Sequence, residues 1–176
     1  MKALVVYESM FGNTRAVAMA IADGLRQDAD VTVLPVGDAS EDLLGAMDLV
    51  VVGGPTHVHG MSRAATRKDA AKQADKPGSQ VKLEPGADGP GVRDWLASLG
   101  QHGGSAAAFD TRMKGPAILT GRASKGIAGL LRQHGLTMAA KPASFLVTRN
   151  NVLVQGQENR ARDWGARLGG RAAAAA

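Results

Sequence analysis

Apolar residues gather in five short runs along this chain. The runs cover residues 3–7, 31–36, 48–53, 105–109 with 116–119 close behind, and 137–147. Within residues 4–6 and 49–52, apolar and polar positions do not alternate. Strands that are apolar on both faces are typical of a parallel sheet covered by helices on each side. The pattern therefore predicts five strands in an open, doubly wound α/β fold.

Between these runs, apolar positions recur at the spacing of a helix that buries one face. Such stripes occupy residues 14–25, 92–99, 127–134 and 161–168. Three glycines lie inside the predicted helices: Gly24, Gly126 and Gly129. Each lowers the stability of its helix by up to about 1 kcal/mol relative to alanine, and we expect these glycines to allow close packing on the sheet.

One stretch departs from this alternation of strands and helices. Residues 75–91 read DKPGSQVKLEPGADGPG, which is rich in proline, glycine and charge and indicates a surface loop. With 176 residues, the chain is long enough for one domain with a substantial core. We expect that domain to span residues 1–170, and residues 171–176, an arginine and five alanines, to be a frayed tail.

Composition excludes several classes of function. The net charge is +5, but the basic residues are scattered and the six aromatic residues form no stacking cluster, which argues against a nucleic-acid partner. No apolar run approaches the roughly 20 residues that span a bilayer, so no membrane partner is expected. The absence of cysteine excludes disulfides and thiolate metal sites and fits a cytoplasmic protein.

The first apolar run leads directly into Ser9-x-Phe11-Gly12-Asn13-Thr14 and a predicted helix. A turn of backbone N–H groups and hydroxyls at a helix N-terminus is a phosphate site. The turn contains no lysine, unlike a nucleotide-triphosphate loop, and one glycine, unlike a dinucleotide loop. It suits a single terminal phosphate such as that of FMN. The alternative is a plain turn in which Ser9 or Asn13 caps the helix.

Two further segments follow the ends of predicted strands. Residues 53–61, GGPTHVHGM, predict a rigid loop on which a flat ligand could rest. Two histidines two positions apart, without cysteine or a nearby carboxylate, are a weak metal signal, and no metal is expected. Residues 109–113, FDTRM, end the fourth strand with polar groups. Beyond them Thr120 or Ser124 is expected to cap the next helix.

A short basic segment follows the predicted loop of residues 53–61. Arg63, Arg67 and Lys68 have helical spacing, which favours a solvated helix face. The alternative is a docking patch for an acidic partner or for the 2′-phosphate of NADPH.

Taken together, the three segments resemble those of the flavodoxin-like FMN-binding proteins, and the resemblance covers nearly the whole chain. The motif from Ser9 to Thr14 looks like their phosphate loop, in a variant that also occurs in diiron flavoproteins. The resemblance implies a sheet of strand order 2-1-3-4-5, non-covalently bound FMN, and no catalytic side chain. It also implies three groups of cofactor-binding residues: Ser9, Met10, Phe11, Gly12, Asn13 and Thr14 on the phosphate; Pro55, Thr56, His57, Val58, His59 and Gly60 along the flavin ring; and Asp110, Thr111 and Arg112 on the other side of the ring.

Three functions remain open at this point. The first is an electron shuttle between protein partners, and the second is an FMN-dependent NAD(P)H:quinone or related reductase. The third is a domain of the same fold that no longer binds flavin. We expect the chain to act as a monomer or a homodimer.

Overall fold

Parallel strands form the centre of the molecule, in the order implied by the resemblance. The computed structural model describes residues 1–79 and 81–173. The sheet order is β2-β1-β3-β5-β6, with β7 also paired to β5 and β4 paired to β3. The strands are β1 (Lys2–Tyr7), β2 (Asp30–Pro35), β3 (Leu49–His57), β4 (Gly60–Met61), β5 (Ser105–Met113), β6 (Thr137–Met138) and β7 (Ala143–Val147). The order 2-1-3-4-5 is thus confirmed, with the fifth strand divided into β6 and β7, which both run parallel to β5.

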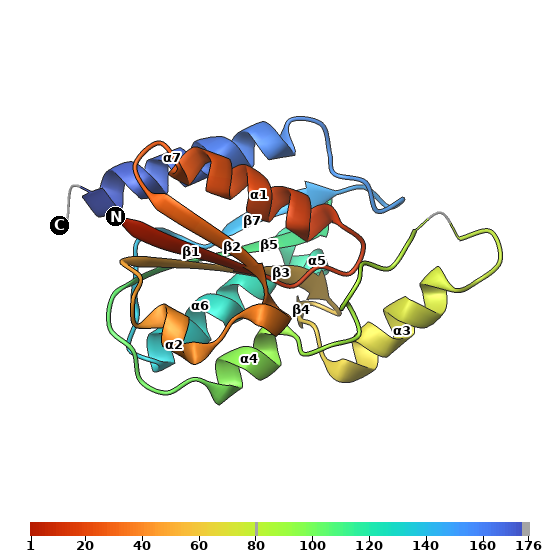
Figure 1. The fold of residues 1–176 in the computed structure, drawn as a ribbon. Coiled ribbons are helices and arrows are strands. Elements are labelled where there is room, and N and C mark those ends of the chain that lie inside the picture. The colour runs from red at the N-terminus through yellow and green to blue at the C-terminus, as the bar shows by residue number, and fades with distance from the viewer. Residues whose placement is uncertain (80, 174–176) are drawn as a thin grey trace.

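Helices cover both faces of this sheet (Figure 1). They are α1 (Asn13–Leu25), the 3-10 turn η1 (Val36–Asp38), α2 (Glu41–Leu44), α3 (Ala64–Ala74), α4 (Val92–Ser98), α5 (Ala117–Thr120), α6 (Ala123–Gln133) and α7 (Gln157–Ala173). On one face lie α1 and α7, and on the other lie α2, α4 and α6. None of the described helices combines the length and the hydropathy that crossing a membrane would need.

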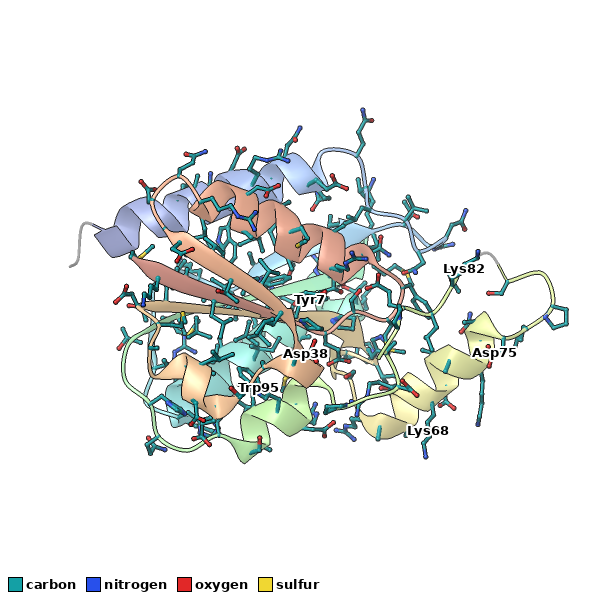
Figure 2. All side chains as sticks on the ribbon, in the orientation of Figure 1. Tyr7, Asp38, Lys68, Asp75, Lys82 and Trp95 are labelled. Carbon is teal, nitrogen blue, oxygen red and sulfur yellow. The ribbon has the colours of Figure 1, made fainter. Side chains whose placement is uncertain are left out.

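Two apolar cores, one on each face, explain why the strands do not alternate. Leu4 and Val6 of β1 pack toward α4 and α6, whereas Val5 packs toward α1 and α7. Both faces of a central strand are therefore buried. Each apolar side chain on it stabilises the folded state by about 25 cal/mol for every Å² of apolar area removed from water. In Figure 2 Trp95 lies on the α4 side, where its indole N–H donates to the Ala39 carbonyl at 2.9 Å.

Two predicted boundaries need correction. Of residues 116–119, Pro116 is the N-cap of the short helix α5 and the other three lie within it, whereas the fourth strand itself continues to Met113. The run was too short for its apolar content to distinguish a strand from a helix. At the other end, α7 runs to Ala173, so the helix extends into the expected tail. Residues 174–176 lie outside the described part.

Glycines allow α1 and α7 to cross in close contact. A Cβ atom on Gly24 would lie 2.0 Å from the carbonyl oxygen of Arg162, and one on Gly165 would lie 2.1 Å from that of Ile21. The close packing expected of Gly24 therefore occurs against a second helix rather than against the sheet.

The segment between β4 and α4 extends away from the sheet. In Figure 1 α3 projects to one side of the molecule, and in Figure 2 Lys68, Asp75 and Lys82 lie on this projecting part. The described residues of 75–91 form turns without a helix or strand, in agreement with the expected loop. The segment returns to the domain at Glu84, whose backbone N–H donates to the Met10 carbonyl at 2.9 Å.

Candidate functional site

The three predicted segments meet at the carboxyl edge of the sheet. They surround a cavity of about 180 Å³, here called the inner hollow. Its predicted lining residues are Met10, Phe11, Asn13, Thr14, Pro55, Thr56, His57, Thr111 and Arg112. Ligands of doubly wound folds bind at this edge, where the strand order reverses, here between β1 and β3.

Beside it lies a more open cavity of about 780 Å³, here called the outer hollow. Phe11, Thr56 and His57 line both hollows, and Val58 lines the outer one, which α3 closes on its far side. Within the described residues, the predicted site residues that line neither hollow are Ser9, Gly12, His59, Gly60 and Asp110.

The predicted phosphate loop, from Ser9 to Thr14, leaves the N-terminus of α1 without a side-chain cap. The N-cap residue is Gly12, with φ of 89°, a left-handed conformation that glycine adopts without a Cβ clash. The Ser9 hydroxyl accepts the N–H of Gly12 at 3.2 Å, so neither Ser9 nor Asn13 caps the helix. The first N–H groups of a helix have no helical acceptor. Those of α1 are therefore available to an anion.

Asn13 and Thr14, expected on the phosphate, both have partners within the protein. The Thr14 hydroxyl lies 2.7 Å from that of Thr111, and this pair joins α1 to β5. The Asn13 amide donates to the backbone oxygen of Asn151 at 2.9 Å and to its side-chain oxygen at 3.1 Å. In this arrangement the backbone of the loop, more than these side chains, offers hydrogen bonds to an anion.

The second segment is a β-hairpin rather than a loop. β3 continues to His57, and β4 begins at Gly60, so Val58 and His59 form a two-residue turn. Their φ angles are 45° and 69°, as a type I′ turn requires. A β-branched residue such as Val58 rarely adopts this conformation, and this residue is 81% exposed. Strain of this kind is characteristic of functional sites.

The third segment is also not a loop, because Asp110, Thr111 and Arg112 lie within β5. Consecutive strand residues face opposite sides of a sheet, so Thr111 faces α1 and Asp110 faces α6. The Asp110 carboxylate accepts the N–H of Ser124 at 2.8 Å. Arg112 folds back to donate to the carbonyl of Gly115 at 2.9 Å.

The cap of α6 therefore differs from the one expected at Thr120 or Ser124. Asp110 accepts the N–H of Ser124, and the Thr56 hydroxyl accepts that of Ala123 at 3.0 Å. Both acceptors come from strands that are distant in sequence. A cap of this kind has no local sequence signature.

Asp110 is fully buried, and this burial raises the pKa of its carboxyl group. The folded protein thus binds the proton more tightly than the unfolded chain, whose Asp pKa is about 3.9. The stabilising effect of the proton is complete below that pH and is lost as the pH rises through the folded-state pKa. We expect Asp110→Asn to be more stable than the wild type at neutral pH, and the difference to disappear near about pH 4.

Urea unfolding at several pH values measures this difference. Asp88→Asn, in an exposed loop position, is the control and should leave the pH profile of the wild type unchanged. An Asp110→Asn profile parallel to that of the wild type would contradict the assignment.

Beneath the hairpin lies a network of buried polar groups. Glu8 accepts hydrogen bonds from the Ser62 hydroxyl and from the N–H of Val92, the latter at 2.9 Å. Arg67 donates to Ser62 at 3.2 Å and to Asp94 at 2.7 Å. Its side chain is only 6% exposed. Arg67 therefore belongs neither to a solvated helix face nor to a docking patch.

His57 lies at the edge of this network. Burial is the largest influence and lowers the pKa of its imidazole, the Glu8 carboxylate opposes the effect, and the Arg67 charge adds to it. Its neutral ring lines both hollows.

Two segments at the site were missed by sequence reasoning. The loop after β7 contributes Thr148, Arg149 and Asn151 to the inner hollow. Asn151 has φ of 57°, and the N–H₂ group of its amide is buried without a partner among the described residues. The signal that could have found this loop is the Asn150-Asn151 pair directly after an apolar strand.

The second missed segment is the return of the 75–91 loop. Glu84 pairs with Arg15 of α1 at 3.2 Å. Its carboxylate also lies 3.6 Å from the position that a Cβ of Gly12 would take. A negative charge therefore lies beside the phosphate loop.

These features fit a flat ligand that ends in a phosphate. The N-terminus of α1 is open to an anion, and the unpartnered amide of Asn151 is a further donor beside the same hollow. Phe11 and His57 provide flat surfaces along the outer hollow. The outer hollow, with its volume of about 780 Å³, lies within the range of about 300–1,000 Å³ that is typical of small-molecule sites.

Solved structures of similar fold include several flavodoxins. A flavodoxin from the domain Archaea is 23% identical, with a TM-score of 0.66, over 98% of this chain and 99% of the archaeal one. A flavodoxin from Streptococcus pneumoniae TIGR4 is 17% identical, with a TM-score of 0.66, over the full length of both chains. Rubredoxin oxygen:oxidoreductase from Desulfovibrio gigas is 17% identical, with a TM-score of 0.60, over 98% of this chain and 36% of that chain. At these identities the likeness shows the fold.

The family comparison covers the part of the chain that contains all three predicted segments. A comparison with curated proteins found no match. The family model described as flavodoxin matches residues 5–114. Because the match extends over more than half of the chain, this protein belongs to the flavodoxin family.

Proposed function

We propose that this chain, as a single domain of residues 1–170, holds FMN non-covalently at the two hollows and shuttles electrons between protein partners. The observation that carries the proposal is the N-terminus of α1, which has no side-chain cap and opens beside the inner hollow. Members of the flavodoxin family bind FMN and transfer electrons through it, and this chain is an FMN-binding electron-transfer protein of that family.

Each part of the site would have a separate task. The N–H groups at the start of α1 would bind the phosphate, with the buried amide of Asn151 as an additional donor. The end of β3 from Pro55 to His57 would support one side of the ring, and Phe11 would exclude water beside it. The Thr14–Thr111 pair would fix the distance between α1 and β5.

FMN supplies the electron transfer when it is bound, so no side chain has to act as acid, base or nucleophile. The contribution of the chain is to bind, to orient and to exclude water. Because burial lowers its pKa, the imidazole of His57 is neutral and would add no positive charge beside the flavin ring.

Titration of the apoprotein with FMN, followed by quenching of flavin fluorescence, tests the proposal. We expect a dissociation constant well below about 100 μM. A weaker constant would correspond to less than roughly 6 kcal/mol of binding free energy, and the cofactor would then be mostly absent. That result would favour the alternative of a domain that no longer binds flavin.

The position of the phosphate is tested by Glu84→Gln. Removal of the negative charge beside Gly12 is expected to tighten FMN binding about fivefold, since one charge at the protein surface changes binding by roughly 1 kcal/mol after screening. The same titration measures the change, and added salt should reduce it. Asp42→Asn, an exposed charge change on α2, is the control. Unchanged or weaker binding by Glu84→Gln would place the phosphate elsewhere.

The second candidate function is an FMN-dependent NAD(P)H:quinone or related reductase. The observation in its favour is the outer hollow, which is open and large enough for a small molecule and whose described lining has Phe11 and His57 as its aromatic residues. Rapid oxidation of NAD(P)H with a quinone, without an added reductase, would favour this candidate over the shuttle. A cytoplasmic location and a monomeric or homodimeric state stay predictions.

A further inference from the structure

Three arginines from three different elements line one cavity beside β7. The cavity has a volume of about 390 Å³ and is here called the arginine hollow. Arg112 comes from β5, Arg122 is the N-cap residue of α6, and Arg160 lies near the start of α7. The other lining residues are Pro142, Ala143, Ser144, Leu146 and Gln157, so the described lining contains no acidic side chain.

Neutral acceptors hold all three guanidinium groups in place. Arg122 donates to the Ser144 hydroxyl at 3.2 Å and to the Pro142 carbonyl at 3.0 Å. Arg160 donates to the Ser144 carbonyl at 2.7 Å and also lies 5.0 Å from the centre of the Phe145 ring. Arg112 is held by the carbonyl of Gly115. These bonds orient the charges without neutralising them.

No carboxylate of the described residues lies within 4.0 Å of these three arginines. The nearby acid is Asp110, which is fully buried and bonded to the start of α6, with a pKa raised by its burial. Burial and the charges of Arg112, Arg167 and Arg122 lower the pKa of Arg160. Because a guanidinium keeps its proton in proteins, an anion is the remaining means of relieving this repulsion.

We propose that the arginine hollow binds a phosphate group of a small molecule that exchanges electrons with the flavin. The planar guanidinium fork matches the oxygens of a phosphate, and Arg122 and Arg160 approach Ser144 from two different helices. This inference rests on FMN binding and on the second candidate function, the reductase, and names the class of its small-molecule electron donor.

Arg112 connects this hollow to the cofactor site. Arg112 lines both the arginine hollow and the inner hollow, so a molecule anchored at Arg122 and Arg160 would extend toward the place proposed for FMN. The burial of Arg67 and its pairing with Asp94 also argue against the alternative of a phosphate patch at Arg63 and Arg67.

Inorganic pyrophosphate is the probe for this site. It is titrated by calorimetry into the FMN-saturated protein, in which the phosphate loop is filled, and separately into the apoprotein. We expect a single site in the FMN-saturated protein, weakened about tenfold by Arg122→Gln and by Arg160→Gln, because each loses charge-assisted hydrogen bonds. Arg160→Lys keeps the charge without the fork and should show a smaller loss.

Arg162→Gln is the matched control on the same helix. Arg162 contacts Asn159 at 3.0 Å and Asp23 at 4.0 Å and does not line the arginine hollow. Pyrophosphate binding should be unchanged in this variant. Thermal unfolding of each variant without ligand checks that the fold is intact. If Arg160→Gln fails to fold, Arg160→Lys, which keeps the positive charge, takes its place in the titration.

Kinetics with NADPH and a quinone test the identity of the small molecule. Arg122→Gln and Arg160→Gln are expected to raise the KM for NADPH about tenfold, in proportion to the loss of pyrophosphate binding. An unchanged KM would overturn the proposal that the arginine hollow binds a phosphate group of the electron donor.

Two results would overturn the site itself. One is pyrophosphate binding that is equal in the wild type and both glutamine variants. The other is binding of a polyglutamate peptide, dependent on Arg122 and Arg160, without binding of pyrophosphate, which would make the cluster a protein-docking surface. Failure of FMN binding with intact, arginine-dependent pyrophosphate binding to the apoprotein would reject the proposed function and leave the anion site standing.

Discussion

Replacing Arg67 with methionine is expected to lower the free energy of unfolding by about 3 kcal/mol. The guanidinium group lies almost fully buried between Asp94 and Ser62, and Ser62 in turn donates to the buried carboxylate of Glu8. Its removal takes away the buried cation that is linked to the Glu8 carboxylate through Ser62, in a region of low dielectric constant. The cost lies at the lower end of the range of about 3–5 kcal/mol for buried pairs, because Asp94 is 48% exposed and remains solvated.

Arg63→Met, one turn earlier and exposed, is the control and should change stability by less than about 0.5 kcal/mol. Chemical unfolding measures both variants. NMR titration of His57 gives an independent readout, since loss of the Arg67 charge should raise the pKa of this imidazole. Equal stability of the two variants would contradict the burial of Arg67.

Replacing Gly24 with alanine should destabilise the fold by about 3 kcal/mol, although alanine is the better helix former. The new Cβ would lie 2.0 Å from the backbone oxygen of Arg162 and 2.7 Å from the backbone nitrogen of Ala166. Backbone atoms cannot rotate away, so α1 and α7 have to separate.

Gly129→Ala on α6 provides the matched control. A Cβ at that position meets no heavy atom within 4 Å, so the variant should gain up to about 1 kcal/mol from helix propensity. The midpoint temperature of thermal unfolding should therefore fall in Gly24→Ala and rise in Gly129→Ala. A shift of the same sign in both variants would contradict the close crossing of α1 and α7.

The sequence predicted the strands and the helices that cover the sheet because their signals are local. Leu4, Val5 and Val6 are all buried, and they alternate between the two cores. The stripe of Val17, Ile21 and Leu25 is fully buried in α1. The repeat of side chains every 2 residues in a strand and every 3.6 residues in a helix is a property of the backbone itself. Both repeats can therefore be recognised in the sequence without knowing what each face contacts.

The meeting of the three segments followed from the sequence, whereas the hydrogen bonds of their residues were decided by partners far away in the chain. The three segments do converge at one edge of the sheet. Asp110, however, turns toward α6, Thr14 bonds to Thr111, and Asn13 bonds to Asn151 in the loop after β7. Each of these partners lies between 14 and 138 positions away in sequence.

The sequence by itself determined the α/β alternation, the strand that leads directly into the turn before α1, and the three segments that meet at the carboxyl edge of the sheet. The tertiary structure alone decided that Arg67 is buried, that Gly24 faces α7, and that Arg112, Arg122 and Arg160 share one hollow. The physical reason is the range of the interactions. Helix and strand periods arise between neighbouring residues, whereas desolvation and charge clustering depend on which distant elements the fold brings into contact.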